Sequence, residues 1–145
     1  MIVRPAAVVL ALVMPVAAGA CNKSKPPTAA TAQQLAAAIA ARGAGCQDFA
    51  ASDTASAAGS INASSGACTV RGKRVALAVY QSSAERDKGQ VELLKGCIGR
   101  RALNPNSTGT WAFAKGPTWV VLGADHESVI TVGKALHTSV QTSPC

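Results

Sequence analysis

The chain is short of aromatic and acidic residues, and both shortages limit what it can do. Two Trp, two Phe and one Tyr among 145 residues provide no aromatic platform on which bases would stack, and no nucleic-acid-binding motif is present. Seven Asp and Glu against 14 Lys and Arg give a formal net charge of +7. Such a charge suits a solvated surface, or attraction to anionic headgroups of a membrane. We therefore expect no nucleic-acid partner.

Motifs for catalysis and for metal binding are also missing. The sequence has no nucleophile elbow, phosphate-binding loop, zinc-protease helix or C-x-x-C pair. The spacing of Cys46, Cys68, Cys97 and Cys145 fits no zinc pattern. We predict no catalytic residues, no metal ion and no cofactor. The alternative is an enzyme that acts on an envelope substrate, with its site in a cleft beside residues 47–66.

The first 20 residues have the layout of an export signal. Arg4 is the only charged residue before Cys21, an apolar run covers residues 6–13, and small residues occupy 18–20. A positive start, an apolar centre and a small-residue end are typical of a secretory signal peptide. The apolar run is too short to span a bilayer as a mature helix. We therefore predict that residues 1–20 are a signal peptide.

Cys21 is the predicted site of lipidation. Gly19 and Ala20 directly before the cysteine resemble a bacterial lipobox, which implies that Cys21 receives a diacylglyceryl group and becomes the first residue. Ala18 stands where leucine is usual, and residues 18–20 also satisfy the A-x-A rule, so secretion without lipid is the alternative. The chain has five cysteines, and lipidation of one leaves an even set for pairing. A lipid carrying two acyl chains would hold the protein on the extracytoplasmic face of the cell membrane.

The other cysteines are predicted to form disulfide bonds. Four cysteines allow three connectivities, and we favour Cys46–Cys68 and Cys97–Cys145. The first bond would tie the end of the first helix to a central strand, and the second would tie the second helix to the C-terminus. Each would stabilise the fold by about 3 kcal/mol through loop closure. That contribution offsets a core built from small side chains.

The rest of the chain divides into a tether and one domain. Residues 21–30 include Pro26 and Pro27 and lack an apolar period, so we predict a lipidated N-terminus and a flexible tether. Residues 31–145 have the size of a single domain. Capping residues and apolar periods predict helices over 31–43, from Ser82 to about 102, and from Asp125 to about 140. Alternation predicts strands over 67–70, 75–80, 110–114 and 119–122, with 47–50 a short candidate strand.

These elements predict an α+β fold. Two hairpins build an antiparallel sheet, and helices on one face complete a two-layer sandwich in the order α-β-β-α-β-β-α. The 52–66 stretch, rich in Ala, Ser and Gly, is predicted to be a loop.

Two groups of residues are candidates for binding. Arg71, Lys73 and Arg74 at one turn, with residues 100–101, are candidates for an anion-binding patch, but the favoured interpretation is a pair of solvated turns. Trp119 would anchor a ligand or touch lipid headgroups if it faced outward. The favoured position for Trp119 is the core face of its hairpin.

The layout resembles a group of small actinobacterial secreted lipoproteins of unknown function. The matching features are Cys21, Cys46 at the end of a short helix, Cys68 in the first strand of a pair, and the hairpin sequence of residues 116–121, Gly-Pro-Thr-Trp-Val-Val. The resemblance implies a fold and an envelope location, and it brings no known activity. We therefore expect a membrane-anchored, non-catalytic binding or accessory module that meets an envelope protein or an anionic wall polymer. The envelope enzyme and the simple secreted protein are the alternatives.

Overall fold

The structure is a computed structural model that describes residues 25–52, 64–103 and 109–145, with the side chains of all of these except 97–103. The predicted signal peptide and Cys21 lie outside the described residues. So does most of the predicted loop, over residues 53–63.

Helices and strands are both present in the described part of the chain. The helices are α1 (Ala32–Ala41), α2 (Ser83–Leu103) and α3 (His126–Leu136). The strands are β1 (Gln47–Ser52), β2 (Ser64–Val70), β3 (Lys73–Val79), β4 (Thr110–Lys115), β5 (Trp119–Gly123) and β6 (Val140–Pro144). They form one sheet in the order β1-β2-β3-β5-β4-β6, with every neighbouring pair antiparallel. The predicted α+β class with an antiparallel sheet is confirmed.

The sheet is wider than the two predicted hairpins. The hairpins β2–β3 and β4–β5 are present and meet through β3 and β5 in the centre, and β1 and β6 add an edge on each side. Strand β6 was not predicted, because Val140 was expected to lie on the third helix. That helix ends at Leu136, since His137 has a left-handed backbone with φ of +53°. The amide of Thr138 then donates to the carbonyl of Gly133 and closes the helix end.

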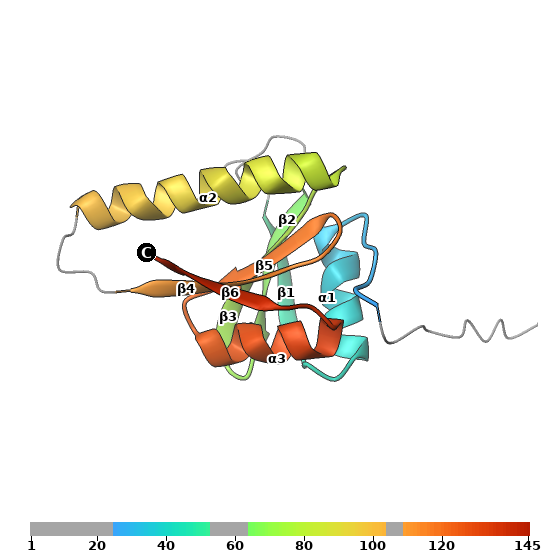
Figure 1. Ribbon diagram of the computed structural model, residues 1–145. Coiled ribbons are helices and arrows are strands. Elements are labelled where there is room, and N and C mark those ends of the chain that lie inside the picture. Colours follow the sequence, from blue (N-terminus) through green and yellow to red (C-terminus); the bar gives the residue numbers. More distant parts are fainter. Residues whose placement is uncertain (1–24, 53–63, 104–108) are drawn as a thin grey trace, which may run out of the picture.

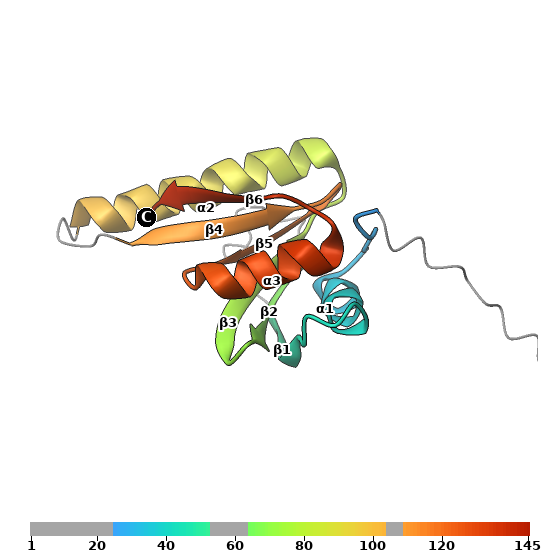
Figure 2. The same ribbon diagram turned by 60° about the horizontal axis from the view of Figure 1, so that its bottom comes forward.

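The prediction that all helices cover one face was wrong. Figures 1 and 2 show α1 and α3 on one face of the sheet and α2 on the other, which makes three layers. Along β3, Val75, Leu77 and Val79 pack toward α1 and α3, whereas Ala78 packs in the second cluster with Tyr80 directly after the strand. Because both faces of the central strands are apolar, each face requires its own helical cover.

The larger core lies between the sheet and the α1–α3 layer. Its largest fully buried side chains include Trp119, Leu35, Ile39 and Leu136. The disulfide Cys46–Cys68 closes one end of this core, with 5.5 Å between the two Cα atoms, which confirms the first predicted pairing. Cys145 is disulfide-bonded as well. Its predicted partner, Cys97, is among the residues whose side chains are not described, so that pairing stays a prediction.

Helix α2 packs on its face of the sheet through Leu93 and Leu94, which contact the cluster that contains Ala78 and Tyr80. Val91 on the same helix is 49% exposed. Gly89 is buried, and a Cβ atom there would collide with the ring of Tyr80. The glycine therefore permits close approach of the helix to the sheet.

Candidate functional site

The segment before α1 is held against the domain. The indole Nε1 of Trp119 donates to the carbonyl of Pro27 at 2.8 Å, and the guanidinium Nη1 of Arg42 donates to the carbonyl of Lys25 at 3.0 Å. We expected residues 21–30 to be a flexible tether. In the described part of that range, from residue 25 onward, the chain lies on the surface of the domain. Contacts with the domain therefore extend back to Lys25, four positions after Cys21.

An open groove runs beside this segment. It encloses about 680 Å³ between the N-terminal segment, the start of β2, the end of β3 and the turn between β4 and β5. Its lining side chains carry hydroxyl, amide and apolar groups, and among the described residues that line it none is Asp, Glu, Lys, Arg or His. The lining residues are Thr28, Ala29, Ala30, Gln34, Ser64, Val79, Tyr80, Gln81 and Thr118.

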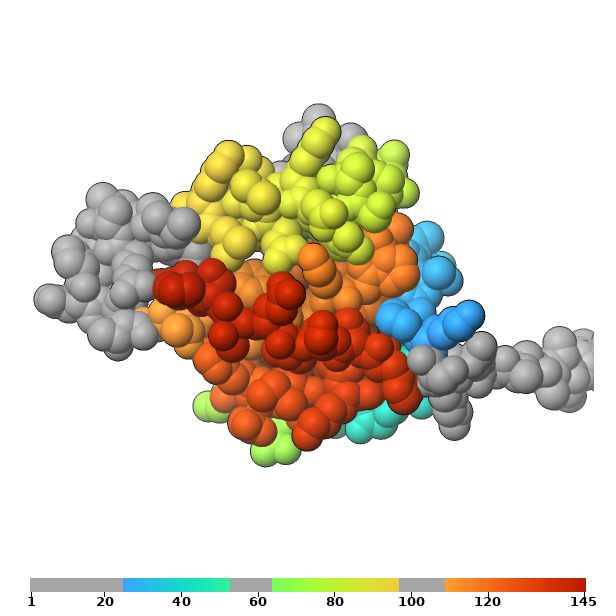
Figure 3. All heavy atoms as spheres, viewed as in Figure 1, coloured from blue at the N-terminus to red at the C-terminus, as the bar shows by residue number. Residues whose placement is uncertain are grey.

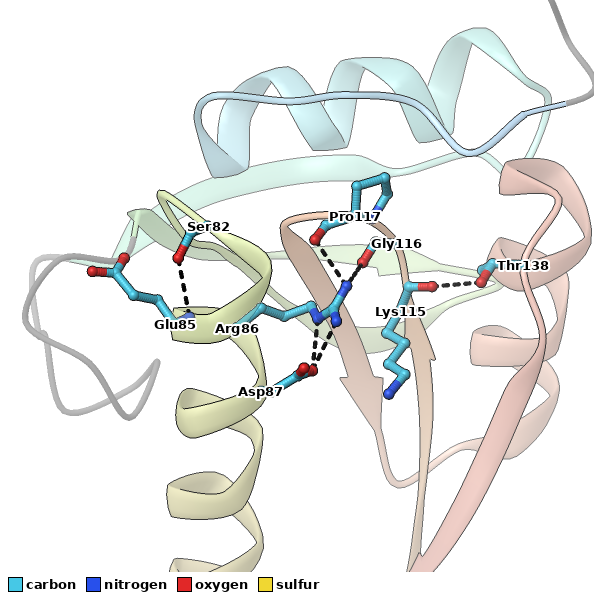
Figure 4. Close-up of polar contacts among 8 residues, drawn as sticks. All are labelled: Ser82, Glu85, Arg86, Asp87, Lys115, Gly116, Pro117 and Thr138. Atoms are coloured by element: carbon cyan, nitrogen blue, oxygen red, sulfur yellow. Dashed lines mark hydrogen bonds and ion pairs between the residues drawn. The ribbon is translucent and has the colours of Figure 1, made fainter.

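The β4–β5 turn that forms one wall of the groove is fixed by α2. The guanidinium of Arg86 donates to the carbonyl of Gly116 and to that of Pro117, the latter at 2.8 Å, and it also pairs with Asp87 at 2.8 Å (Figure 4). The side chain of Arg86 is only 13% exposed. Hydrogen bonds from a charged donor to carbonyls are among the stronger ones. These bonds hold the backbone of the turn in place against α2.

Local hydrogen bonds place Arg86 and hold the other side of the turn. The Ser82 hydroxyl accepts from the amide of Glu85 at 3.2 Å and caps the start of α2 (Figure 4). The cap places Arg86 in the first turn of the helix, beside the carbonyls of the β4–β5 turn. On the far side, the Thr138 hydroxyl donates to the carbonyl of Lys115 at 2.5 Å. Gly116 is needed here because a Cβ atom would collide with the Trp119 ring.

Among the described residues that line the groove, Tyr80 is the only one with a titratable side chain. It is 3% exposed, and desolvation by burial raises the pKa of its phenol to about 12. The phenol therefore stays neutral at ordinary pH and does not act as a general base there. The described lining residues contribute hydrogen bonds and apolar contact, without an acid–base pair.

This pKa makes a direct prediction, because Tyr80 is the single tyrosine of the chain. Tyrosinate ultraviolet absorbance should titrate near 12 in the folded protein and near 10 in denaturant. The unfolded state then releases its proton first, so the contribution of Tyr80 to stability is fully present below pH 10 and falls by up to roughly 1.4 kcal/mol per pH unit between 10 and 12. Tyr80→Phe should remove that part of the slope. A native titration near 10 would contradict the buried phenol.

The three predicted basic residues lie at the β2–β3 turn and the start of β3. Arg71 and Gly72 have φ of +53° and +74° and Val70 pairs with Lys73, so the loop has two residues, as in a type I′ turn. All three cations are exposed. Arg74 lines a small hollow that also includes Asp48. The side chains of the predicted additions, residues 100–101, are not described.

Arg71 and Lys73 lie near a carboxylate at the start of α3. Hydrogen bonds from the side chain and the amide of Ser128 hold the pKa of Asp125 below its usual range, and the nearby positive charges of Lys73 and Arg71 lower it further. The Ser128 hydroxyl lies 2.6 Å from that carboxylate and 2.9 Å from the carbonyl of Val70. Arg71 and Lys73 thus lie near Asp125 and Arg74 lies near Asp48, so the three cations do not face one common site.

Trp119 belongs to the core. It is fully buried, as the favoured interpretation of the sequence placed it, and the alternative of an outward-facing Trp119 that anchors a ligand was wrong. The alternation of its strand was the signal for the buried position, and the bond to Pro27 had no signal in the sequence. The groove itself was missed, because its lining comes from segments that no motif connects.

Comparison with known proteins found no match among family models, curated proteins or solved structures. Across residues 25–52, 64–103 and 109–145, no group of three His, Cys, Asp or Glu side chains is placed to hold a metal ion. Within the same ranges, no helix has both the length and the apolar character needed to cross a membrane.

Proposed function

We propose that this chain is a lipid-anchored protein of the cell envelope that acts by binding. The predicted signal peptide directs export, and the lipid on Cys21 anchors the protein to the membrane. The disulfide Cys46–Cys68 supports this location, since structural disulfides persist in oxidising compartments outside the cytoplasm.

The pairing of the cysteines supports the proposed role of Cys21. Cys46 pairs with Cys68, and Cys145 is also disulfide-bonded. If Cys97 is the partner of Cys145, as we propose, Cys21 is the one cysteine without a disulfide. A lipoprotein requires a free thiol at this position, because the sulfur atom of that thiol carries the lipid.

The groove is the proposed binding surface, and its uncharged lining is the observation that carries this part of the proposal. Hydroxyl and amide side chains beside apolar ones suit a ligand that is itself uncharged and forms hydrogen bonds. In the envelope, a neutral glycan segment has this chemistry. An anionic wall polymer on Arg71, Lys73 and Arg74 is less favoured, because those cations diverge and have Asp48 and Asp125 beside them.

A titration with a neutral N-acetylglucosamine oligosaccharide, followed by amide NMR shifts, tests the groove. Saturable shifts should cluster at residues 28–30 and at Thr118. Gln81→Trp places a large side chain in the groove and should weaken binding at least about tenfold, or about 1.4 kcal/mol. Gln141→Trp on the exposed face of β6 is the matched control and should leave binding unchanged.

Two outcomes would overturn the groove as the site. One is an absence of shifts with the oligosaccharide at any accessible concentration. The other is a set of shifts confined to residues 71–74 when a soluble polyanion is added in its place, which would return the binding surface to the β2–β3 turn.

A further inference from the structure

We propose that the face around Lys25 docks on the anionic headgroups of the membrane. The proposal rests on the lipidation of Cys21 proposed above. It adds an orientation to the anchor and names the membrane surface as the partner of one particular face.

The length of chain between the lipid and the domain sets the geometry. Three residues lie between Cys21 and Lys25, and the four residue steps from Cys21 to Lys25 span at most about 14 Å when fully extended. A domain of this size has a radius of gyration of about 13 Å. Because this reach is only about as long as the radius of gyration of the domain, the protein cannot turn freely above the bilayer. The side that carries Lys25 stays closest to the headgroups.

This side is basic. A hollow of about 390 Å³ lies between the C-terminal ends of α1 and α3, and Arg42, Lys134 and His137 line it. Arg42 also binds the carbonyl of Lys25 at 3.0 Å, which places Lys25 at the same edge. Figures 1 and 3 show the first described residues beside the C-terminal end of α3. The described residues that line the hollow include no acidic side chain.

Basic residues at helix C-termini also have a structural explanation, because they complement the helix dipole. That explanation accounts for Lys134 in the last turn of α3, but Lys25 lies on no helix. Each helix end contributes about half a negative charge, so two ends cancel about one of the three Lys and Arg charges. The face keeps a net positive charge toward the membrane.

The β2–β3 turn provides a matched control on the same molecule. Asp125 lies near the positive charges of Lys73 and Arg71 and caps the N-terminal end of α3. Lys134 and His137 lie at the C-terminal end of the same helix. An 11-residue helix separates the two ends by roughly 16 Å. Lys73→Glu with Arg74→Glu thus changes the net charge as much as Lys25→Glu with Lys134→Glu, on a different part of the surface.

The test is sedimentation of the exported Cys21→Ser chain with vesicles of mixed phosphatidylglycerol and phosphatidylcholine, at low salt. Each Lys or Arg near an anionic surface strengthens binding roughly fivefold, so the Lys25→Glu, Lys134→Glu variant should bind at least about 25-fold more weakly. The Lys73→Glu, Arg74→Glu variant should lose far less. Vesicles of phosphatidylcholine alone should bind none of these proteins appreciably. Thermal melts of both variants establish that the fold is kept.

Equal loss of vesicle binding in the two variants would mean that binding depends on net charge alone, and it would overturn the proposal. Loss confined to Lys73→Glu, Arg74→Glu, or no preference of the parent chain for phosphatidylglycerol, would overturn it as well. Because Cys21 is absent from this assay, its result is independent of lipidation. A failure of the anchor appears instead in the mass of the exported protein.

Discussion

Trp119→Ala is expected to lower the free energy of unfolding by about 3–5 kcal/mol. The indole is fully buried at the start of β5 and belongs to the core between the sheet and the α1–α3 layer. Removing it leaves a large cavity in a core that otherwise contains mainly Ala, Val and Leu. A domain of this size is stable by only about 5–15 kcal/mol, so urea denaturation should show a strongly reduced midpoint or no folded protein.

Trp119→Phe separates the hydrogen bond from the packing. The ring remains, while the donor to the carbonyl of Pro27 is lost, and we expect a smaller cost of about 1–2 kcal/mol. Hydrogen exchange at residues 28–30 should rise in this variant, because the N-terminal segment loses its contact with the core. A cost below about 1 kcal/mol for Trp119→Ala would contradict the central position of the indole.

Cys21→Ser is expected to move the protein from the membrane fraction to the medium. Two acyl chains of about 16 carbons, at roughly 0.8 kcal/mol per buried methylene, make anchoring effectively permanent, whereas the basic face alone holds the domain weakly. The measurement is fractionation of cells and partition into detergent, each followed by immunoblotting. Cys97→Ser is the control for the loss of a thiol, and it should stay in the membrane fraction.

Retention of Cys21→Ser in the membrane after a salt wash would contradict a lipid anchor. Release of the parent chain by salt alone would mean that the charge of the domain, and no lipid, holds the protein on the membrane. Release of the parent chain and of Cys21→Ser to the same extent would support the simple secreted protein.

Local patterns were sufficient for most of the fold. Thr31 caps α1 and Asp125 caps α3 as predicted, through bonds to the amides of Gln34 and Ser128. The same alternation that predicted β3 and β5 is present in the sheet. The face of the sheet that each helix covers was not predictable from the apolar period of that helix alone. It depends on both faces of the sheet being apolar, which becomes decisive only when the strands are assembled.

The edge strands and the groove depend on contacts between distant segments. β6 follows a helix end fixed by the left-handed His137, a residue with no strong preference for that conformation. The groove needs Pro27 to meet Trp119, 92 residues later, and no local signal encodes that contact. The basic residues of the β2–β3 turn were visible in sequence, but their divergence depends on which face each side chain takes.

The intact mass of the protein recovered from the cell envelope tests the central claim most directly. We predict a chain that begins at Cys21 and carries a diacylglyceryl group, with four thiols oxidised in two disulfide bonds. Reduction should then add the mass of four hydrogen atoms and leave the lipid in place. A chain of the same length without lipid, or one that keeps residues 1–20, would contradict the account.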